Sequence, residues 1–355
     1  MIQKNLFKFV RQAVRSNFSQ PERPYRLTYI ATRRCQLKCR MCRIWENQRD
    51  GELSLPQIDK FFRNSNGFSW INLSGGEIFL RSDIVEVIET IYRNSGSLYL
   101  LDFPTNGFDT ETVLRSVKKI LTFKIPRILV TVSLDGPPGL HDELRGVKGS
   151  WESAVATFDA LRGLRSSRFD VFLGTTLQES NRGRFPETLE HVEKKIGQVS
   201  FSDFHVNLLH HSRHYYGNVN TGEERRRSDR WSELKQIMNR RRKNPLNPVV
   251  FLEKRYQQLC RSYLLYGKTP VPCQALSASF FLDSNGDLYP CTIHGKRLGN
   301  IKDYGYALSK FWDSDLLKKT RAEIIEGRCP QCWTPCEAYQ SILANLLPGF
   351  PETEK

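Results

Sequence analysis

The sequence Leu27-Thr-Tyr-Ile-Ala31-Thr-Arg-Arg-Cys35-Gln-Leu-Lys-Cys39-Arg-Met-Cys42 places three cysteines in a loop directly after an apolar run. Three thiolates in so short a segment can hold one iron–sulfur cluster and leave one iron without a protein ligand, because cysteine is the usual ligand of such clusters. A structural zinc site is the alternative, but zinc usually takes four ligands and no fourth Cys or His lies nearby. Three unrelated buried thiols are less expected, since Arg and Lys crowd the loop.

The composition excludes several classes of protein. The chain has 355 residues, of which 39% are hydrophobic, enough for one large domain and a smaller one. No apolar run approaches the roughly eighteen residues of a membrane-spanning helix, and the amino terminus does not resemble a signal peptide. We therefore expect a soluble, cytoplasmic protein.

Cysteine count and charge indicate the kinds of partner. Nine cysteines, an odd number, without an export signal favour thiolate ligands over disulfides. The net charge of +15 favours anionic partners: nucleic acid, anionic lipid, an acidic peptide or an acidic electron carrier. Charge alone does not choose among them.

Short apolar runs alternate with amphipathic helical patterns in the first two thirds of the chain, which predicts a parallel sheet. A Ser54/Gln57 capping box marks the start of one helix, over residues 55–62. Periodicity leaves open whether the sheet is doubly wound or a partial barrel, but in both cases ligands bind at the carboxyl ends of the strands. The six apolar runs are residues 27–31, 70–73, 98–103, 128–134, 171–177 and 204–209.

The composition and pattern of the sequence change near residue 245. Charged residues concentrate at 223–230 and 239–244, and Pro245 follows, so we place a domain boundary between residues 244 and 245. Beyond it, two runs flank Asn285-Gly286, which predicts a β-hairpin with a two-residue turn.

Residues 1–20 predict a separate basic amphipathic helix. Its inward positions would be Leu6, Phe9, Val10, Ala13 and Val14, and its outward positions Lys4, Lys8, Arg11 and Arg15. Such a helix either docks on the barrel or lies on an anionic membrane surface through residues 1–18.

A second motif, Leu73-Ser-Gly-Gly-Glu77, follows the second apolar run. Paired glycines let the backbone approach a ligand closely, and Glu77 can accept hydrogen bonds from a positively charged amine. A plain turn is the alternative. Since this loop and the cysteine loop would follow neighbouring strands, we expect them to meet at one face of the sheet.

Together these motifs resemble the radical S-adenosylmethionine superfamily, over residues 25 to 209. The resemblance implies a partial (β/α)6 barrel, which we assign to residues 21–244. The matching motifs are the cysteine loop with Met41, Gly75-Gly76-Glu77, Thr105-Asn-Gly107, Val132-Ser-Leu-Asp-Gly-Pro137, His141-Asp142 and Arg145-Gly146.

The resemblance also implies the cofactors of the first site. A 4Fe–4S cluster would be held by Cys35, Cys39 and Cys42, and S-adenosylmethionine would chelate the remaining iron. Reductive cleavage would then give a 5′-deoxyadenosyl radical that abstracts hydrogen. By the same resemblance, Glu77 and the backbone of Gly75 and Gly76 hold the amine, Ser133 and Asp135 lie near the ribose and carboxylate, Arg145 assists, and Leu177 contacts adenine.

The other cysteines resemble the auxiliary-cluster domain called twitch in its short form and SPASM in its long form, here residues 245–355. The cysteines are Cys260, Cys273, Cys291, Cys329, Cys332 and Cys336. At least one auxiliary 4Fe–4S cluster is expected, with Cys273, Cys291, Cys329 and Cys332 as preferred ligands. Cys260 and Cys336 could complete a different four or bind a second, incomplete cluster. The run departs from SPASM because no Cys follows Cys336, and a zinc ribbon remains the alternative.

Two groups of polar residues have open interpretations. His205, His210, His211 and His214 either line a substrate pocket or belong to an ordinary polar loop. Arg33, Arg34, Lys38, Arg40 and Arg43 either attract an acidic ferredoxin or flavodoxin as reductant or neutralise the cluster's charge.

We therefore expect an enzyme that starts radical chemistry from S-adenosylmethionine and modifies an organic substrate, a peptide that it oxidises or crosslinks. A sugar or lipid precursor is the alternative substrate. A non-catalytic, metal-stabilised nucleic-acid binder is the alternative of another class, but aromatic stacking platforms beside a basic stripe are not evident, so nucleic acid is not an expected partner.

Overall fold

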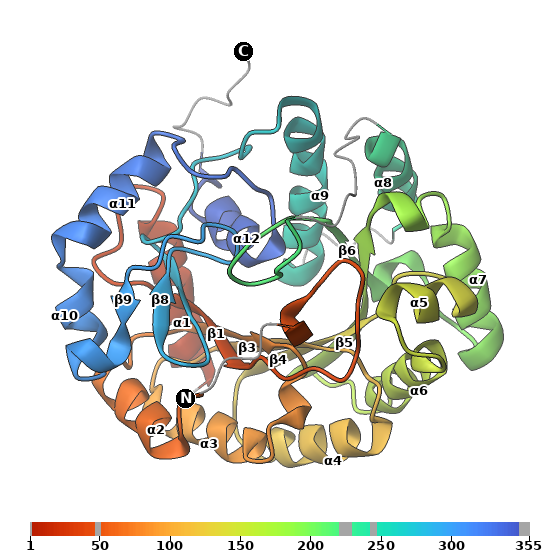
Figure 1. Cartoon of the computed structure of the whole chain (residues 1–355), viewed down its shortest axis with the longest axis horizontal. Coiled ribbons are helices and arrows are strands. Elements are labelled where there is room, and N and C mark those ends of the chain that lie inside the picture. Colours follow the sequence, from red (N-terminus) through yellow and green to blue (C-terminus); the bar gives the residue numbers. More distant parts are fainter. Residues whose placement is uncertain (1, 47–50, 220–228, 242–246, 348–355) are drawn as a thin grey trace.

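The computed structural model describes residues 2–46, 51–219, 229–241 and 247–347. Its centre is one nine-stranded sheet in the order β6-β5-β4-β3-β2-β1-β7-β8-β9 (Figure 1). Strands β1 to β6 are parallel, and each contains one of the six predicted apolar runs in whole or in large part. They are β1 (Arg26–Thr32), β2 (Trp70–Gly75), β3 (Leu100–Thr105), β4 (Arg127–Ser133), β5 (Phe169–Leu177) and β6 (Phe204–Leu208).

Helices follow the strands in alternation and lie in an arc outside them (Figure 1), as in the predicted partial barrel. The hydrophobic core fills the layer between strands and helices. The predicted capping box is present, with the Ser54 N–H donating to Gln57 Oε1 at 3.0 Å. The helices are α1 (Ile2–Arg15), α2 (Leu55–Asn64), α3 (Ile84–Asn94), α4 (Thr110–Leu121), α5 (Pro138–Arg145), α6 (Ser150–Arg162), α7 (Phe185–Ile196), α8 (Asp229–Arg240), α9 (Pro248–Tyr266), α10 (Leu308–Trp312), α11 (Asp315–Ile325) and α12 (Pro335–Leu343).

The carboxy-terminal region extends the barrel sheet. Strand β7 (Ser279–Leu282) pairs in parallel with β1, and β8 (Asp287–Tyr289) and β9 (Gly299–Asn300) continue the sheet in antiparallel fashion. The cysteine-rich region is therefore joined to the barrel by backbone hydrogen bonds next to the strand that leads into the cysteine loop. The predicted boundary between residues 244 and 245 lies outside the described residues, and the division into three segments stays a prediction.

The predicted hairpin is present, but its two-residue turn is wrong. The Gly286 N–H donates to the Asp283 carbonyl at 2.9 Å, so Ser284 and Asn285 are the central residues of the turn. Gly286 follows with a φ of 94°, the left-handed conformation that glycine adopts readily and that a bulged, three-residue connection requires. The Asn-Gly pair was correctly associated with a hairpin and incorrectly placed within it.

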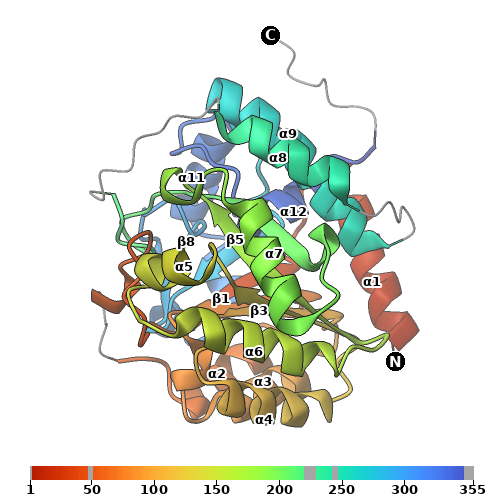
Figure 2. The same ribbon diagram turned by 90° about the vertical axis from the view of Figure 1, so that its right-hand side faces the viewer.

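Helix α1 packs at the amino-terminal ends of the strands (Figure 2). Phe9 stacks on Tyr99, and the Asn5 side chain donates to the Leu98 carbonyl at 2.9 Å. The predicted orientation of this helix is wrong in part, because Leu6, Val10 and Val14 are exposed rather than inward. The face that docks includes polar Asn5, because the strand starts present carbonyl groups that need donors, and Ser16, whose hydroxyl donates locally to the Ala13 carbonyl.

None of the described helices combines the length and apolar character needed to cross a membrane.

Candidate active site

The loop with Cys35, Cys39 and Cys42 leaves β1 at the carboxyl edge of the sheet and has a fixed course. The N–H groups of Lys38 and Arg40 donate to the carbonyls of Arg145 and Leu144, at 3.0 Å and 2.9 Å. On either side of these two residues, Leu37 and Met41 are buried in an apolar cluster with Leu144 and Cys39. Two buried side chains and two backbone bonds therefore hold the loop against the end of α5.

The three thiols of this loop lie close enough to influence one another. Burial raises the pKa of Cys35 to about 11 and of Cys42 to about 12, and the neighbouring Cys39 adds to both increases. Burial also raises the pKa of Cys39. None of the nine cysteines forms a disulfide. A bound metal must displace these thiol protons, so the loop provides three shielded sulfur ligands for a strongly bound metal group.

The glycine pair after β2 fits tightly against the cysteine loop. A Cβ atom on Gly75 would lie 2.3 Å from the Thr32 carbonyl oxygen, and one on Gly76 would lie 2.3 Å from the Arg34 carbonyl oxygen and 2.8 Å from Cys35 Cβ. Only glycine permits this approach. Because of it, the Glu77 N–H reaches the Arg34 carbonyl at 2.8 Å, so the loops after β1 and β2 meet as predicted.

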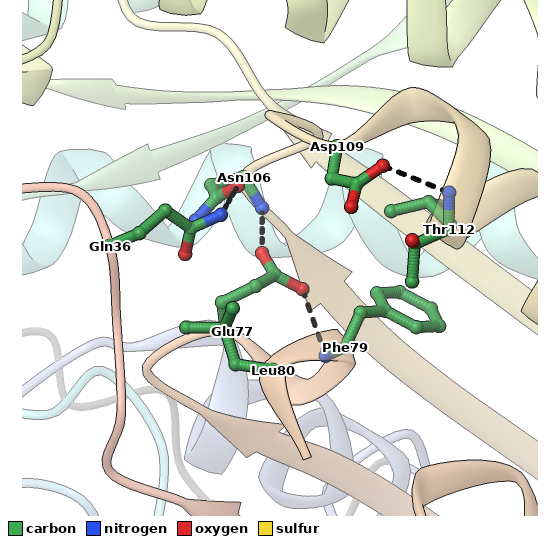
Figure 3. A pocket seen from close by; sticks show the side chains of 8 residues that line it. Gln36, Glu77, Phe79, Leu80, Asn106, Asp109 and Thr112 are labelled. Carbon is green, nitrogen blue, oxygen red and sulfur yellow. Dashed lines mark hydrogen bonds between the residues drawn. The ribbon is translucent and has the colours of Figure 1, made fainter. Parts of the chain in front are cut away.

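Glu77 is a buried carboxylate among neutral donors (Figure 3). It accepts hydrogen bonds from the Asn106 N–H at 2.6 Å, the Thr105 hydroxyl at 3.0 Å and the Phe79 N–H at 3.3 Å. Burial raises its pKa to about 7 in spite of these bonds. Within the described part of the chain, no Lys or Arg forms an ion pair with it, although the charge of Arg145 acts on it from a greater distance and lowers its pKa. A bound ammonium group would supply the missing countercharge, so this site fits the amine predicted for it.

Asn106 links this carboxylate to the cysteine loop. Its side-chain amide lies 3.9 Å from Cys35 Sγ and donates to Gln36 at 3.3 Å, while its backbone N–H binds Glu77. A small cavity of about 20 Å³ lies beside Glu77, Gln36 and Asn106 (Figure 3). Thr105 and Asn106 were predicted only as part of the motif Thr105-Asn-Gly107, without a role for either residue. Their position directly at the end of the third predicted strand was the available signal.

A second charged group lies on the other side of the loop. Arg145 forms an ion pair with Asp135 at 2.5 Å and approaches Cys39 Sγ at 3.8 Å. Burial opposes the charge of Arg145, but Asp135 and Cys39 favour it, and its pKa lies above the usual value. Asp135 also accepts the Thr176 N–H at 2.8 Å, so both of its oxygens are engaged. Arg145 therefore places its positive charge at the edge of the group of three thiols.

Ser133 and Leu177 lie at the same edge of the sheet. Ser133 ends β4 and is half-buried, whereas Leu177 ends β5 and is buried in the main core. The structure thus gathers the residues predicted for the first site at the carboxyl ends of β1, β2, β4 and β5.

Four cysteines of the carboxy-terminal region also form an interacting group. Burial raises the pKa values of Cys273 and Cys291, with Glu337 and Cys332 adding to both increases. Cys329 in turn adds to the raised pKa values of Cys273 and Cys332. These four thiols come from three segments of the chain, because Cys329 and Cys332 share one, and they are the four preferred as auxiliary ligands.

Cys260 and Cys336 have different surroundings. Cys260 is fully buried in α9 and interacts with Tyr256 and Glu253 rather than with another cysteine. Cys336 starts α12, where burial raises its pKa to about 11 and the nearby charges are Arg26, Glu337 and Asp102. These surroundings therefore favour Cys273, Cys291, Cys329 and Cys332 as the ligands of one cluster over any set that includes Cys260.

Among the described residues, no three Cys, His, Asp or Glu side chains converge as the ligands of one metal ion do. The sulfur ligands of a single zinc lie about 4 Å apart, because Zn–S bonds are about 2.3 Å long. Thiolates that bind different irons of one cluster are spaced more widely.

The segment that follows β6 connects the two cysteine regions. His210 Nε2 accepts the Trp333 N–H at 2.9 Å, next to Cys332, and His214 Nε2 lies 3.0 Å from the Cys291 carbonyl. On its other side, the Asn218 side chain donates to the Met41 carbonyl at 2.8 Å. These two histidines are structural connectors, and the segment spans the distance between both groups of thiols.

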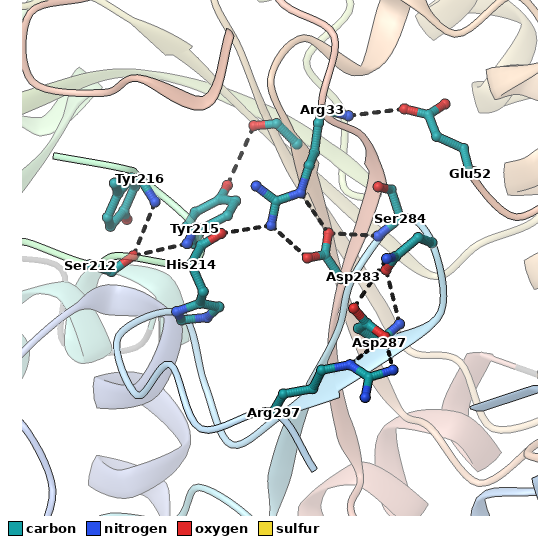
Figure 4. Close-up of polar contacts among 12 residues, drawn as sticks. Arg33, Glu52, Ser212, His214, Tyr215, Tyr216, Asp283, Ser284, Asp287 and Arg297 are labelled. Atoms are coloured by element: carbon teal, nitrogen blue, oxygen red, sulfur yellow. Dashed lines mark hydrogen bonds and ion pairs between the residues drawn. The ribbon is translucent and has the colours of Figure 1, made fainter. Parts of the chain in front are cut away.

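A buried ion pair joins the same two regions (Figure 4). Arg33 and Asp283 form a bidentate pair at 2.9 Å and 2.5 Å, with both side chains almost fully buried. Arg33 also donates to the His214 carbonyl at 2.8 Å. Of the two interpretations given for Arg33, attraction of an acidic reductant is wrong, because β7 lies next to β1 and Asp283 pairs with the buried Arg33 side chain. Arg34, Lys38, Arg40 and Arg43 are exposed.

Comparison with families of known proteins agrees with this geometry. The family model of the radical SAM superfamily matches residues 29–192, and that of the iron–sulfur cluster-binding SPASM domain matches residues 273–336. The second match begins at Cys273 and ends at Cys336, so it leaves out Cys260.

Individual proteins are similar over most of their length. Pre-heme d1 synthase of Dinoroseobacter shibae is 26% identical over 91% of this chain and 83% of its own. The antilisterial bacteriocin subtilosin biosynthesis protein AlbA of Bacillus subtilis is 26% identical over 83% of this chain and 61% of its own. A solved structure of native anSMEcpe with bound AdoMet and a Kp18Cys peptide has the same fold, with a TM-score of 0.58 at 18% identity over 86% of this chain and 83% of that chain.

Proposed function

Because the chain belongs to the radical S-adenosylmethionine superfamily and carries a SPASM-type iron–sulfur domain, we propose that it uses S-adenosylmethionine to modify a peptide. Membership makes it an enzyme with a 4Fe–4S cluster, S-adenosylmethionine and auxiliary iron–sulfur binding as its cofactors. One observation carries the proposal: three shielded thiols lie against a glycine pair that presents a buried carboxylate, and this carboxylate forms no ion pair among the described residues.

In this proposal Cys35, Cys39 and Cys42 hold the first cluster. When bound, the cluster and S-adenosylmethionine together supply a 5′-deoxyadenosyl radical that abstracts hydrogen from the substrate. The loop's contribution is to keep the thiolates together and away from water, because Leu37 and Met41 anchor it in an apolar cluster.

Glu77 binds the ammonium group of the methionine moiety. Its carboxylate is held by Thr105 and Asn106, so its orientation is fixed before the ligand arrives. The backbone of Gly75 and Gly76 adds acceptors, and the Tyr215 hydroxyl, 3.4 Å from the Gly75 carbonyl, limits how that carbonyl can turn. A prearranged acceptor of this kind binds a cation without the cost of ordering flexible groups.

Asp135 and Arg145 orient the rest of the ligand, with Ser133 near the ribose and Leu177 against adenine. The Arg145 guanidinium, next to Cys39, also balances the negative charge that the thiolates bring. Four exposed basic residues lie in and beside this loop, and they attract an acidic reductant such as a ferredoxin or flavodoxin. They are Arg34, Lys38, Arg40 and Arg43.

Cys273, Cys291, Cys329 and Cys332 hold an auxiliary 4Fe–4S cluster, which anchors the substrate or accepts an electron from it. A peptide substrate is supported by the similarity to AlbA, whose name refers to bacteriocin biosynthesis, and by the peptide bound in the anSMEcpe structure. A tetrapyrrole is the second candidate, because pre-heme d1 synthase is similar over a larger share of its length and the charge of +15 suits a polycarboxylate.

The test is anaerobic reconstitution with iron and sulfide, followed by dithionite and S-adenosylmethionine. We expect release of 5′-deoxyadenosine, and we expect its loss in Cys39→Ala but not in Cys260→Ala, which removes a thiol outside both groups. Turnover that persists in Cys39→Ala contradicts the assignment.

The substrate class is tested in the same assay. Peptides encoded by short reading frames beside the gene, and coproporphyrin III, are added in parallel. Stimulated 5′-deoxyadenosine release with a peptide, together with a mass change in it, supports the proposal, and stimulation by the porphyrin alone overturns it in favour of the second candidate.

A further inference from the structure

Helix α1 has three faces, and one of them packs against the rest of the protein, while Lys8 of a second face donates a hydrogen bond to the Ser97 hydroxyl. Positions three or four apart share a face of a helix, so each face is a row along the sequence. The docked row is Asn5, Phe9, Ala13 and Ser16, which are buried or half-buried. A basic row of Lys4, Lys8, Arg11 and Arg15 is exposed.

The third row is apolar and faces outward. We call it the outer strip, and it consists of Leu6, Phe7, Val10, Val14 and, just beyond the helix, Phe18. Phe7 and Phe18 are 69% and 75% exposed, and the three aliphatic side chains are 40% to 47% exposed. Single exposed apolar residues are ordinary, but a continuous row of this kind marks an interaction surface.

The strip is held in place by the docked row and by the carboxy-terminal segment. Asn17 donates to the Leu343 carbonyl at 2.8 Å, and its side-chain oxygen accepts the N–H groups of Leu346 and Leu347 at 2.8 Å and 3.1 Å. These two leucines are also exposed, at 42% and 44%, so they extend the apolar surface beside Phe18. The helix is therefore fixed, and its outer strip stays directed away from the barrel.

The chemistry of the surface identifies its partner. The outer strip lies next to a row of four cations on the same helix, in a chain with a net charge of +15. A second copy of the chain would bring two such rows together and repel. A partner with an apolar interior for the outer strip and anionic groups at its surface for the basic row would match both. An anionic lipid bilayer has that composition.

We propose that α1 binds the protein peripherally to anionic membranes, with the outer strip among the acyl chains and the basic row at the headgroups. The helix lies at the amino-terminal ends of the strands, whereas the cysteine loop leaves their carboxyl ends (Figure 2). A membrane at α1 therefore leaves the candidate active site open. The inference is independent of the proposed reaction.

The test is co-sedimentation of the full-length, cluster-loaded protein with vesicles. Phosphatidylcholine vesicles are compared with vesicles that also contain phosphatidylglycerol. We expect binding to the anionic vesicles that weakens with salt, and binding at least about tenfold weaker in Val10→Gln/Val14→Gln, because two apolar side chains leave the bilayer. Leu316→Gln/Ile325→Gln on α11 is the matched control, since both side chains are exposed there too, and it should bind like the wild type.

Charge is tested separately. Lys4→Gln/Arg11→Gln should weaken binding to anionic vesicles, whereas Lys118→Gln/Lys119→Gln on α4, which removes the same charge elsewhere, should have a smaller effect. All four variants should release 5′-deoxyadenosine at the wild-type rate in solution, so failure here is distinct from failure of the proposed reaction.

Three results overturn the proposal: no binding to anionic vesicles, equal binding to phosphatidylcholine alone, or equal loss in the α1 variants and their controls. A dimer that Val10→Gln/Val14→Gln dissociates, seen by sedimentation, overturns it as well by identifying a second copy as the occupant.

Discussion

The two cysteine regions differ in how the chain assembles them. Cys35, Cys39 and Cys42 lie in one loop, whose course is set by contacts with the end of α5. Cys273, Cys291, Cys329 and Cys332 come from segments up to about sixty residues apart and meet only because β7 and β8 extend the barrel sheet. The first region is thus encoded locally and the second by tertiary structure.

The largest expected effect separates the two regions by their metal content. The wild type should contain about eight irons per chain, since two 4Fe–4S clusters are expected. Cys273→Ala/Cys291→Ala should reduce iron to about four and retain release of 5′-deoxyadenosine, because the first loop does not depend on these thiols. Iron analysis and the product assay check this. Loss of all iron would show that the regions do not assemble independently.

A second test concerns the ion pair that joins the regions. Asp283→Asn leaves the Arg33 guanidinium buried without its countercharge, which should lower the free energy of unfolding by about 3–5 kcal/mol. Glu143→Gln is the control. It breaks the exposed Arg40–Glu143 pair beside the same loop and should cost at most about 1 kcal/mol. Urea unfolding measures both.

The double variant Arg33→Met/Asp283→Leu distinguishes two causes of the destabilisation expected for Asp283→Asn. If the unpaired charge is responsible, replacing both partners with apolar side chains should recover most of the lost stability. A double variant as unstable as Asp283→Asn would instead indicate that the specific geometry of the pair holds the regions together.

This pair also shows what the sequence could and could not reveal. The strands, the capping box and the meeting of the first two loops were predicted, because each depends on local pattern and on the rule that parallel strands end at one edge. The pairing of Arg33 with Asp283 could not be predicted, because Asp283 lies 250 positions later and is adjacent only once β7 pairs with β1. Asn106 was included in the Thr105-Asn-Gly107 motif, but its contact with Glu77 was not predicted, since Glu77 follows another strand.

Helix α1 gives a second example. Its apolar residues were assigned to the interior by their hydrophobicity alone. The docked face instead follows the hydrogen-bonding needs of the strand starts, which favour Asn5 and leave Val10 outside. Periodicity finds the faces of a helix, but it does not say which face docks when two of them are suitable.

The third prediction concerns the ligand-binding carboxylate of the first region. Glu77→Gln should weaken S-adenosylmethionine binding about 10- to 100-fold, because a hydrogen bond to a charged group is worth about 1.5–3 kcal/mol. The second region should keep its iron. Glu86→Gln, which removes an exposed carboxylate on α3, is the control and should bind normally.

The same carboxylate predicts a pH dependence. Its pKa is about 7 in the ligand-free protein, and only the ionised form attracts an ammonium group. Affinity should therefore be constant above pH 7 and fall up to about tenfold per pH unit below it, as the carboxylate becomes protonated. Isothermal titration at several pH values measures this, and Glu77→Gln should remove the dependence. An equal slope in the variant would assign the titration to another group.

The smallest expected effect comes from two glycines that flank one turn. Gly146 and Gly149 both have left-handed backbones, with φ of 70° and 83°. A Cβ on Gly146 would lie 2.5 Å from the Lys38 carbonyl oxygen, within the cysteine loop, whereas a Cβ on Gly149 would meet nothing within 4 Å. Each alanine should cost about 1–2 kcal/mol of stability from its backbone conformation. Only Gly146→Ala should also displace the loop.

The difference between the two variants separates the effect of displacing the cysteine loop from the effect of backbone strain, which both variants share. Gly146→Ala should alter the electron paramagnetic resonance signal of the first cluster and weaken S-adenosylmethionine binding severalfold, while the signal of the auxiliary cluster stays unchanged. Gly149→Ala should leave both signals as in the wild type. Equal changes in the two variants would mean that the loop does not depend on its contact with α5. A changed auxiliary signal in Gly146→Ala would mean that displacement of the first region is transmitted to the second through Arg33 and the segment after β6.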